Sequence, residues 1–402
     1  MKMNGVVRGH LSFSLCHFPL APCPPPLYNI RMKKPKSLKT KIIVTAVLAV
    51  LAGLSAGVLF LTRRTPEAVT KLYTQGVFKY ISLPVKWLEN LIPYSAGELA
   101  LLTLCIVLPI ALIVSVVRCF TRGSARPLAK YGLNVLTLAA LAVILYVWFG
   151  GLNYNALTFA ERHGYELKES TAAELMDLCT ELSERAAAER NKLPQDANGT
   201  VISDATVFEL CTMAQAGYDA IARRFPEFQG FYPRPKPALT STLMCYFQIS
   251  GIYPYISPEA IVNARTPVYE LPHTICHEMA HQRGVAREDE ANYVGYLAAV
   301  NNPDPLFRYS GYLEALSYSL SALGRASGEA YRRVLPLINR GVLRDIAAAD
   351  KFWKSFEEKN ELPAKISSAV NNTYLQVQNI PDGTRSYGRM VDLLLAEYRE
   401  AH

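Results

Sequence analysis

Apolar residues gather into three long runs in the first part of this chain, at residues 42–62, 98–117 and 131–149. Each run has about the 20 residues that a helix needs to cross the hydrocarbon core of a bilayer, and basic residues flank the runs. The pattern predicts three transmembrane helices in a membrane domain at 32–150, with the lipid bilayer as its partner. We expect residues 151–402 to form one large domain outside the lipid.

Beyond residue 150 the apolar positions take the spacing of amphipathic helices. The pattern predicts helices at 170–191 and 204–225, and later at 312–323, 328–337, 342–360 and 387–401. Between 236 and 266 the chain is rich in Pro, Gly, Tyr and Ile, which favours short strands, best placed at 242–249 and 251–256. The expected fold is mainly α with a small β portion, in addition to the three transmembrane helices.

Charge predicts the orientation of the chain. Residues 1–150 hold 17 of the 42 Lys and Arg residues but only 3 of the 34 Asp and Glu residues. Basic residues crowd the approach to the first run and the short loop between the second and third, so both segments are expected in the cytoplasm. The loop 63–97 is also basic, but it contains an amphipathic stretch, 69–91, suited to the outer leaflet. The N-terminus is therefore predicted to be cytoplasmic and 151–402 extracytoplasmic. This topology explains the basic excess and argues against nucleic-acid binding.

The N-terminal segment and the cysteines say less. Residues 1–31 lack periodicity, whereas Met32-Lys33-Lys34-Pro35-Lys36 is typical of the start of a signal anchor. We expect 1–31 to precede a natural start at Met32, or alternatively to form a disordered cytoplasmic tail. The 8 cysteines show no close-spaced framework. A disulfide between Cys179 and Cys211 is an alternative if the domain lies in an oxidising compartment.

The candidate chemistry lies at residues 277–281, which read His-Glu-Met-Ala-His, the H-E-x-x-H pattern of zinc peptidases. On a helix, His277 and His281 lie one turn apart on one face and can bind a single Zn²⁺. Glu278 can then act as general base toward the metal-bound water. Pro272 and Gly284 predict where this helix begins and ends. The alternative is an ordinary amphipathic helix whose histidines are solvated or satisfied in the core.

A catalytic zinc site needs a third protein ligand. A metzincin would place it six residues after His281, where Arg287 stands, so that subclass is excluded. A second helix is predicted to open with Glu288, and Asn292 shares a face with it. Glu288 is the predicted third ligand, and Asn292 is expected to hydrogen-bond a ligand from the second layer of side chains. Glu290 is the alternative ligand, and either glutamate could instead simply face the helix dipole.

Further site residues are harder to choose. An oxyanion donor is required, and Tyr312, Arg385 or Tyr387 could supply it. His273, one turn before His277, is expected beside the site or exposed rather than on the metal. The predicted strand ahead of the motif could hold an extended peptide by edge pairing, or could be an ordinary hairpin.

Several segments resemble a known family. They are residues 92–95, 151–154, 309–312 and 386–392, together with the motif region 277–292. They are similar to an uncharacterised bacterial family of three-span, membrane-anchored zincin-like proteins, grouped by motif with the glutamate-zincin metallopeptidases. The resemblance runs from about residue 40 onward. It implies a zincin-like domain, a hydrolase class and a bacterial cell membrane, and it gives no substrate.

The residues and the resemblance together predict a zinc-dependent peptidase that acts on a peptide or protein substrate. A membrane receptor or scaffold that keeps the fold without cleaving is the alternative, and the intact Glu278 argues against it. An intramembrane protease would carry the motif inside a hydrophobic span, and residues 273–292 are too rich in charge for that.

Overall fold

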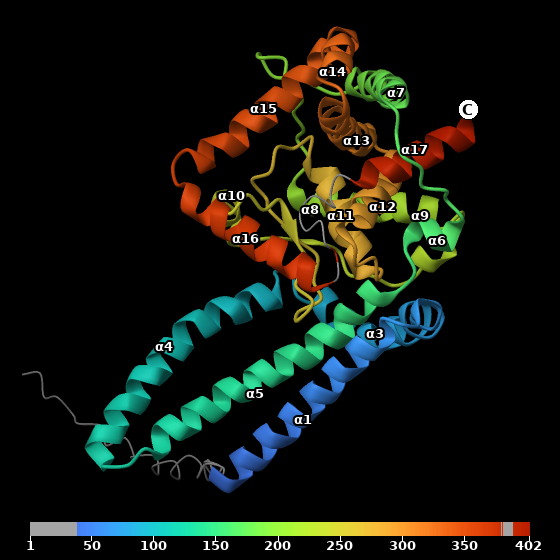
Figure 1. Ribbon diagram of the computed structural model, residues 1–402. Coiled ribbons are helices and arrows are strands. Elements are labelled where there is room, and N and C mark those ends of the chain that lie inside the picture. Colours follow the sequence, from blue (N-terminus) through green and yellow to red (C-terminus); the bar gives the residue numbers. More distant parts are fainter. Residues whose placement is uncertain (1–37, 379, 381–388) are drawn as a thin grey trace, which may run out of the picture.

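The computed structural model describes residues 38–378, 380 and 389–402. The predicted leader 1–31 and the start at Met32 lie outside the described residues, as do Arg385 and Tyr387. Three long helices extend from one side of a larger, mostly helical body (Figure 1). The prediction of a mainly α chain with few strands and three candidate membrane spans is therefore confirmed.

The three apolar helices are each longer than the sequence pattern predicts. Hydroxyl groups join the first and third, since Thr45 Oγ1 lies 2.8 Å from Thr137 Oγ1 and Trp148 Nε1 donates to Ser55 Oγ at 3.1 Å. The second helix begins where Ser95 Oγ accepts from the Glu98 amide at 3.0 Å, and none of its most apolar 18-residue window is buried. By length and composition all three can cross a bilayer, and their orientation stays a prediction. They are α1 (Leu38–Thr62), α4 (Ala96–Arg122) and α5 (Arg126–Phe149).

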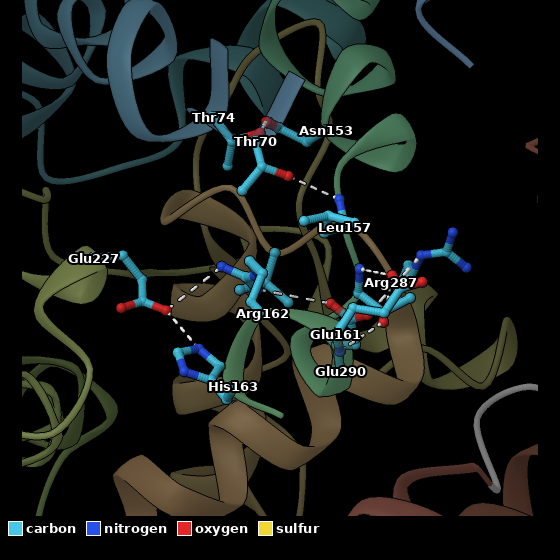
Figure 2. Close-up of polar contacts among 12 residues, drawn as sticks. Thr70, Thr74, Asn153, Leu157, Glu161, Arg162, His163, Glu227, Arg287 and Glu290 are labelled. Carbon is cyan, nitrogen blue, oxygen red and sulfur yellow. Dashed lines mark hydrogen bonds and ion pairs between the residues drawn. The ribbon is translucent and has the colours of Figure 1, made fainter. Parts of the chain in front are cut away.

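The amphipathic stretch after α1 is helical and lies against the start of the larger body. Thr70 Oγ1 accepts a hydrogen bond from the Leu157 amide at 2.8 Å, and Thr74 Oγ1 donates to Asn153 Oδ1 at 2.9 Å (Figure 2). These contacts tie the stretch to the segment that leaves α5. Its elements are α2 (Pro66–Ala68), the π-helix η1 (Val69–Val77) and α3 (Phe78–Asn90), and the segment after α5 is the 3₁₀ turn η2 (Gly151–Asn155).

Helices of the larger body pack around a pair at its centre, α11 and α12, whose residues are nearly all buried. Glutamates three residues after Thr171 and Thr206 close reciprocal capping boxes, which fix where α7 and α8 begin. The helices are α6 (Phe159–His163), α7 (Ala172–Arg190), α8 (Val207–Met213), α9 (Gln215–Ile221), α10 (Ser241–Tyr246), α11 (Leu271–Gln282), α12 (Glu288–Val300), α13 (Pro305–Ala326), α14 (Gly328–Val334), α15 (Arg340–Glu357), α16 (Glu361–Val377) and α17 (Met390–Ala401), with 3₁₀ turns η3 (Pro226–Phe228) and η4 (Leu335–Leu337).

A small sheet lies beside this helical core. Its strands are β1 (Lys236–Pro237), β2 (Gly251–Ile252) and β3 (Ile261–Val262), in the order β1-β3-β2. β3 is parallel to β1 and antiparallel to β2, which lies at the sheet edge. The predicted strand 251–256 is thus shorter than expected, because Pro254 has no amide to donate and the chain turns there, with the Ser257 amide bonded to the Pro254 carbonyl at 2.8 Å.

Three helix and strand predictions are wrong in detail. Residues 242–249 are not a strand, because α10 buries Ser241, Met244 and Cys245 at helical spacing, which a short apolar run does not distinguish from a strand. The single helix predicted at 204–225 is split into α8 and α9. No helix is predicted at 361–377, where the structure forms α16. The six described cysteines of this chain are free thiols, including Cys179 and Cys211.

Candidate metal centre

The helices α11 and α12 bring the motif and the following glutamates together. Pro272 lies in the first turn of α11, and after Arg283 the chain leaves the helix at Gly284, whose φ of 87° favours glycine. Gly295 of α12 faces α11 so closely that a Cβ there would lie 3.0 Å from the His277 amide nitrogen. The two helices can therefore approach until the first residue of α12 reaches the motif.

Three side chains converge on a common centre. His277 Nε2 lies 3.2 Å from His281 Nε2 and 3.2 Å from Glu288 Oε2, and His281 Nε2 lies 3.6 Å from the same oxygen. Tetrahedral zinc with bonds of about 2.0–2.2 Å would separate its ligand atoms by about 3.3–3.6 Å. Two imidazole nitrogens and one carboxylate oxygen at this spacing fit a zinc ion, and among the described residues this is the His/Cys/Asp/Glu group that could hold a metal.

The backbone orients one of these imidazoles. His281 Nδ1 lies 2.7 Å from the carbonyl oxygen of Val285, to which it can only donate. With the proton on Nδ1, the Nε2 lone pair points at the common centre, as a metal ligand requires. Among the described residues, His277 Nδ1 is buried without a hydrogen-bond partner.

Electrostatics also favour a cation at this centre. Burial lowers the pKa of His281, but the carboxylate of Glu288 outweighs it and raises that pKa to about 9. Burial acts to raise the pKa of Glu288, yet the two histidines hold it well below its usual range. The protein thus places an ionised carboxylate where only a proton on imidazole, or a metal ion in its place, balances the charge.

Glu278 is buried beside this centre with one oxygen unused. Its side chain is 4% exposed, and Oε2 has no hydrogen-bond partner within the part of the chain that the structure describes. Burial raises the pKa of Glu278 to about 7, opposed by His277 and His281. Strand β2 passes directly over it, since a Cβ on Gly251 would lie 2.4 Å from Glu278 Oε1. The carboxyl group is therefore held in place and able to take or give a proton near neutral pH.

A cavity of about 760 Å³ opens onto the motif. Its wall includes both histidines, Glu278 and Glu288, strand β2 and the loop that follows it, part of α16, and one residue of α5, Tyr146. Glu314 and Tyr318 of α13 also line it, and burial raises the pKa of Glu314 to about 7. The centre is thus accessible to a molecule much larger than water.

The structure separates the two glutamates that the sequence left as alternatives. Glu288 reaches the histidines, whereas Glu290 points toward Arg162 and Arg287, each 4.0 Å away (Figure 2). Arg162 also lies 3.5 Å from Glu227, so Glu290 belongs to a separate charged network. The role of Glu288 as a metal ligand stays a prediction, and the position of Glu290 does not suit one.

Of the other predicted site residues, Asn292 and Tyr312 lie differently from expectation, whereas His273, predicted beside the site or exposed, lines the cavity. Asn292 lines the cavity, but its amide donates to the Tyr318 hydroxyl at 3.2 Å rather than to a ligand. His273 is buried, and its Nε2 lies 3.1 Å from the Asn292 carbonyl oxygen. Tyr312 is not at the cavity, because its ring packs on Tyr296 with centroids 6.1 Å apart in a different hollow. It does not suit an oxyanion donor.

The sequence did not reveal the tyrosines that do surround the centre. Tyr318 lines the cavity, and Tyr253 and Tyr255 place their rings 6.0 and 6.3 Å from that of His281. In a chain with 23 tyrosines, no local pattern marks these ones. The one indication in the sequence is that Tyr253 and Tyr255 belong to the predicted strand 251–256, which lies ahead of the motif.

Comparison with known proteins gives one match. A family model described as "Protein of unknown function (DUF3810)" matches residues 73–395, a range that includes α4, α5 and every residue of the centre. No curated protein and no solved structure matches the chain.

Proposed function

The chain belongs to the DUF3810 family, and we propose that it is a membrane-anchored, zinc-dependent peptidase with a zincin-like domain. The observation that carries this proposal is the convergence of His277, His281 and Glu288, with Glu278 buried beside them and one of its oxygens free. A structural cluster of buried charges would be expected to satisfy that oxygen. A general base needs it free for the water that it deprotonates.

The residues of this chain divide the chemistry as follows. A Zn²⁺ held by His277, His281 and Glu288 would supply a Lewis acid that acidifies water and polarises the scissile carbonyl. Glu278 accepts the proton of the attacking water through Oε2 and later delivers it to the nitrogen of the leaving amine. The C–N bond breaks, and the products are one carboxylate and one amine. Tyr318, which lines the same cavity, is a candidate neutral donor for the carbonyl oxygen.

The sheet edge favours a peptide as the substrate. Strand β2 is the last strand in the order β1-β3-β2, and Gly251 and Ile252 both line the cavity. An extended peptide added to this edge would pass directly beside Glu278. The three spans and the basic residues near them support a multi-pass location in a bacterial membrane, with the domain after α5 outside the cytoplasm.

The test uses the full-length protein in detergent, with zinc content and hydrolysis of a mixture of fluorescence-quenched random peptides measured together. We expect about one zinc per chain and measurable cleavage. Glu278→Gln should keep the zinc and lose about 10²–10⁴-fold in cleavage rate. Zinc binding without cleavage by the unchanged protein would favour the receptor or scaffold alternative. A chain that binds no zinc would contradict the proposal.

A further inference from the structure

One loop of the cavity connects the ends of two membrane helices. The loop 253–257 contacts α5 at one end, because a Cβ on Gly150 would lie 2.1 Å from the Tyr255 ring. It contacts α4 at the other end, because a Cβ on Gly97 would lie 2.1 Å from Ser257 Oγ. Both glycines leave room for this close approach. Ile256, between the two contacts, lines the cavity and is 50% exposed.

The candidate metal centre lies close to the end of a membrane span. Tyr146, in the last turn of α5, has its ring 6.1 Å from that of Tyr255, which lies 6.3 Å from the ring of His281. Two ring contacts therefore lead from the span to a predicted ligand. Tyr146 and Trp148, at the end of α5, are half-buried aromatic residues of the kind that concentrates at membrane interfaces. The cavity thus lies next to the end of a candidate membrane span.

The rim of the cavity is apolar on the side of α16. Ile366 and Val370 line the cavity and are 48% and 64% exposed. With Leu362 and Val377 they share one face of α16, because their positions fall within less than a quarter of the helix circumference at its 3.6-residue period. Arg63, directly after α1, donates to the carbonyl oxygen of Val377 at 3.2 Å, which holds the end of α16 near the end of a candidate membrane span.

The helices α4 and α5 diverge toward the loop 253–257. α4 and α5 are joined by a short connection at the end remote from the larger body, and their other ends are well separated (Figure 1). None of the most apolar window of α4 is fully buried, and residues 104, 108, 111, 115 and 119 form a half-buried stripe along it. The rest of its circumference is available to lipid or to another transmembrane segment. The apolar rim of the cavity therefore lies near the ends of two candidate membrane spans, α4 and α5, which the loop 253–257 contacts.

We propose that the cavity takes the extracytoplasmic segment next to the membrane span of another, membrane-anchored polypeptide, which enters from the bilayer between α4 and α5. This proposal rests on the proposed function and names its class of substrate. The span of the substrate contacts α4, and the residues after it pass Ile256 and pair with β2. A free peptide lacks the span and would meet an apolar rim that faces lipid.

The test measures binding rather than cleavage, so that it does not depend on hydrolysis. Full-length Glu278→Gln protein is reconstituted in liposomes with a benzophenone photocrosslinker in place of Ile256. The probe is a biotinylated pool of random 12-residue peptides, either joined to a single poly-leucine span in the same liposomes or free in solution. We expect the anchored pool to crosslink at least about tenfold more than the free pool, because tethering raises its effective concentration at the cavity.

A matched control separates entry at the cavity from simple crowding at the surface. The same crosslinker replaces Leu72, which is 70% exposed on η1, the helix held against the end of α5 through Tyr73. It should capture the anchored pool at least about tenfold less than the Ile256 position. A third pool, anchored by a stearoyl chain, should crosslink less than the span-anchored pool. Equal capture at both positions, equal capture of free and anchored pools, or crosslinking to lipid alone would overturn the proposal. Absence of zinc, or of cleavage by the unchanged protein, would instead contradict the proposed function.

Discussion

Two buried carboxylates in the larger body, Asp345 and Glu278, differ in how their oxygens are hydrogen-bonded. Asp345 is completely buried and fully bonded, since it accepts from Arg190 Nε at 2.7 Å, from the Val201 amide at 3.2 Å and from the Tyr309 hydroxyl at 2.5 Å. Glu278 is almost as buried, but its Oε2 has no partner among the described residues. Desolvation of a carboxylate is costly in both places, and only Asp345 recovers the cost through bonds within the protein.

The difference in hydrogen bonding indicates a structural role for Asp345 and a functional role for Glu278. The network of Asp345 connects α15 with α7 and α13, and it has no unused oxygen for a ligand. Glu278 lies beside three atoms that could bind a metal ion and beside a cavity, where an oxygen without a partner is available to a reaction. We therefore expect changes at Asp345 to alter stability and changes around Glu278 to alter zinc binding or turnover.

The largest expected effect is on stability. Asp345→Ala leaves the buried Arg190 without its partner and should destabilise the protein by about 3–5 kcal/mol, measured by thermal unfolding in detergent. Asp350→Ala, which removes an exposed ion pair with Lys354 on the same helix, should change stability by less than about 1 kcal/mol. If Asp345→Ala removed the zinc from a protein that is still folded, the comparison would fail.

Zinc affinity should distinguish the two glutamates at the start of α12. Glu288→Gln weakens the third ligand and should lower the affinity for zinc by more than about a hundredfold, which exceeds the cost of losing an outer hydrogen bond. Glu290→Gln, in the network of Arg162 and Arg287, should leave zinc content unchanged. The measurement is competition with a zinc-sensitive chelator. The reverse result would move the ligand by two residues.

A single methyl group should affect turnover without removing the metal. Gly251→Ala places a Cβ 2.4 Å from Glu278 Oε1 and must displace that side chain. Because a misplacement of about 1 Å can cost a hundredfold, we expect cleavage to fall by up to about that factor while zinc content is kept. Gly324→Ala is the control, since its Cβ would meet ordinary contacts at 3.6 Å. Unchanged cleavage in Gly251→Ala would argue against Glu278 as the base.

The smallest effect is a pH dependence at the cavity wall. Burial raises the pKa of Glu314 to about 7, so the folded protein keeps a proton that the unfolded chain loses above pH 4.5. The contribution of Glu314 to the free energy of unfolding is fully present below pH 4.5 and is lost as the pH rises through about 7. A rise in pKa from 4.5 to about 7 corresponds to at most about 3 kcal/mol. Because Glu314 is partly exposed and solvent screens its charge, we expect Glu314→Gln to be more stable than the unchanged protein by about 1–2 kcal/mol at pH 8, and equal to it at pH 4. The exposed Glu329→Gln should show no such difference, and a gain that is the same at both pH values would exclude this explanation.

Local patterns sufficed for much of the molecule. The apolar runs predicted three helices that can span a membrane, because length and composition alone decide that property. Pro272 and Gly284 predicted the limits of α11, because capping depends on neighbouring residues. Short apolar stretches were less informative. The segment that forms α10 looks like a strand in isolation, and only its packing shows which side chains are buried.

The sequence by itself determined that two histidines share a helix face, because helical periodicity fixes it, and that a glutamate follows soon after, because the order of residues gives that directly. Only the tertiary structure decided that Glu288 rather than Glu290 reaches them, since that depends on how closely Gly295 lets α12 approach α11. It also decided that Tyr318 rather than Tyr312 faces the cavity, and that the cavity meets the end of α5. These relations join residues far apart in the chain, and no local pattern encodes the distances between them.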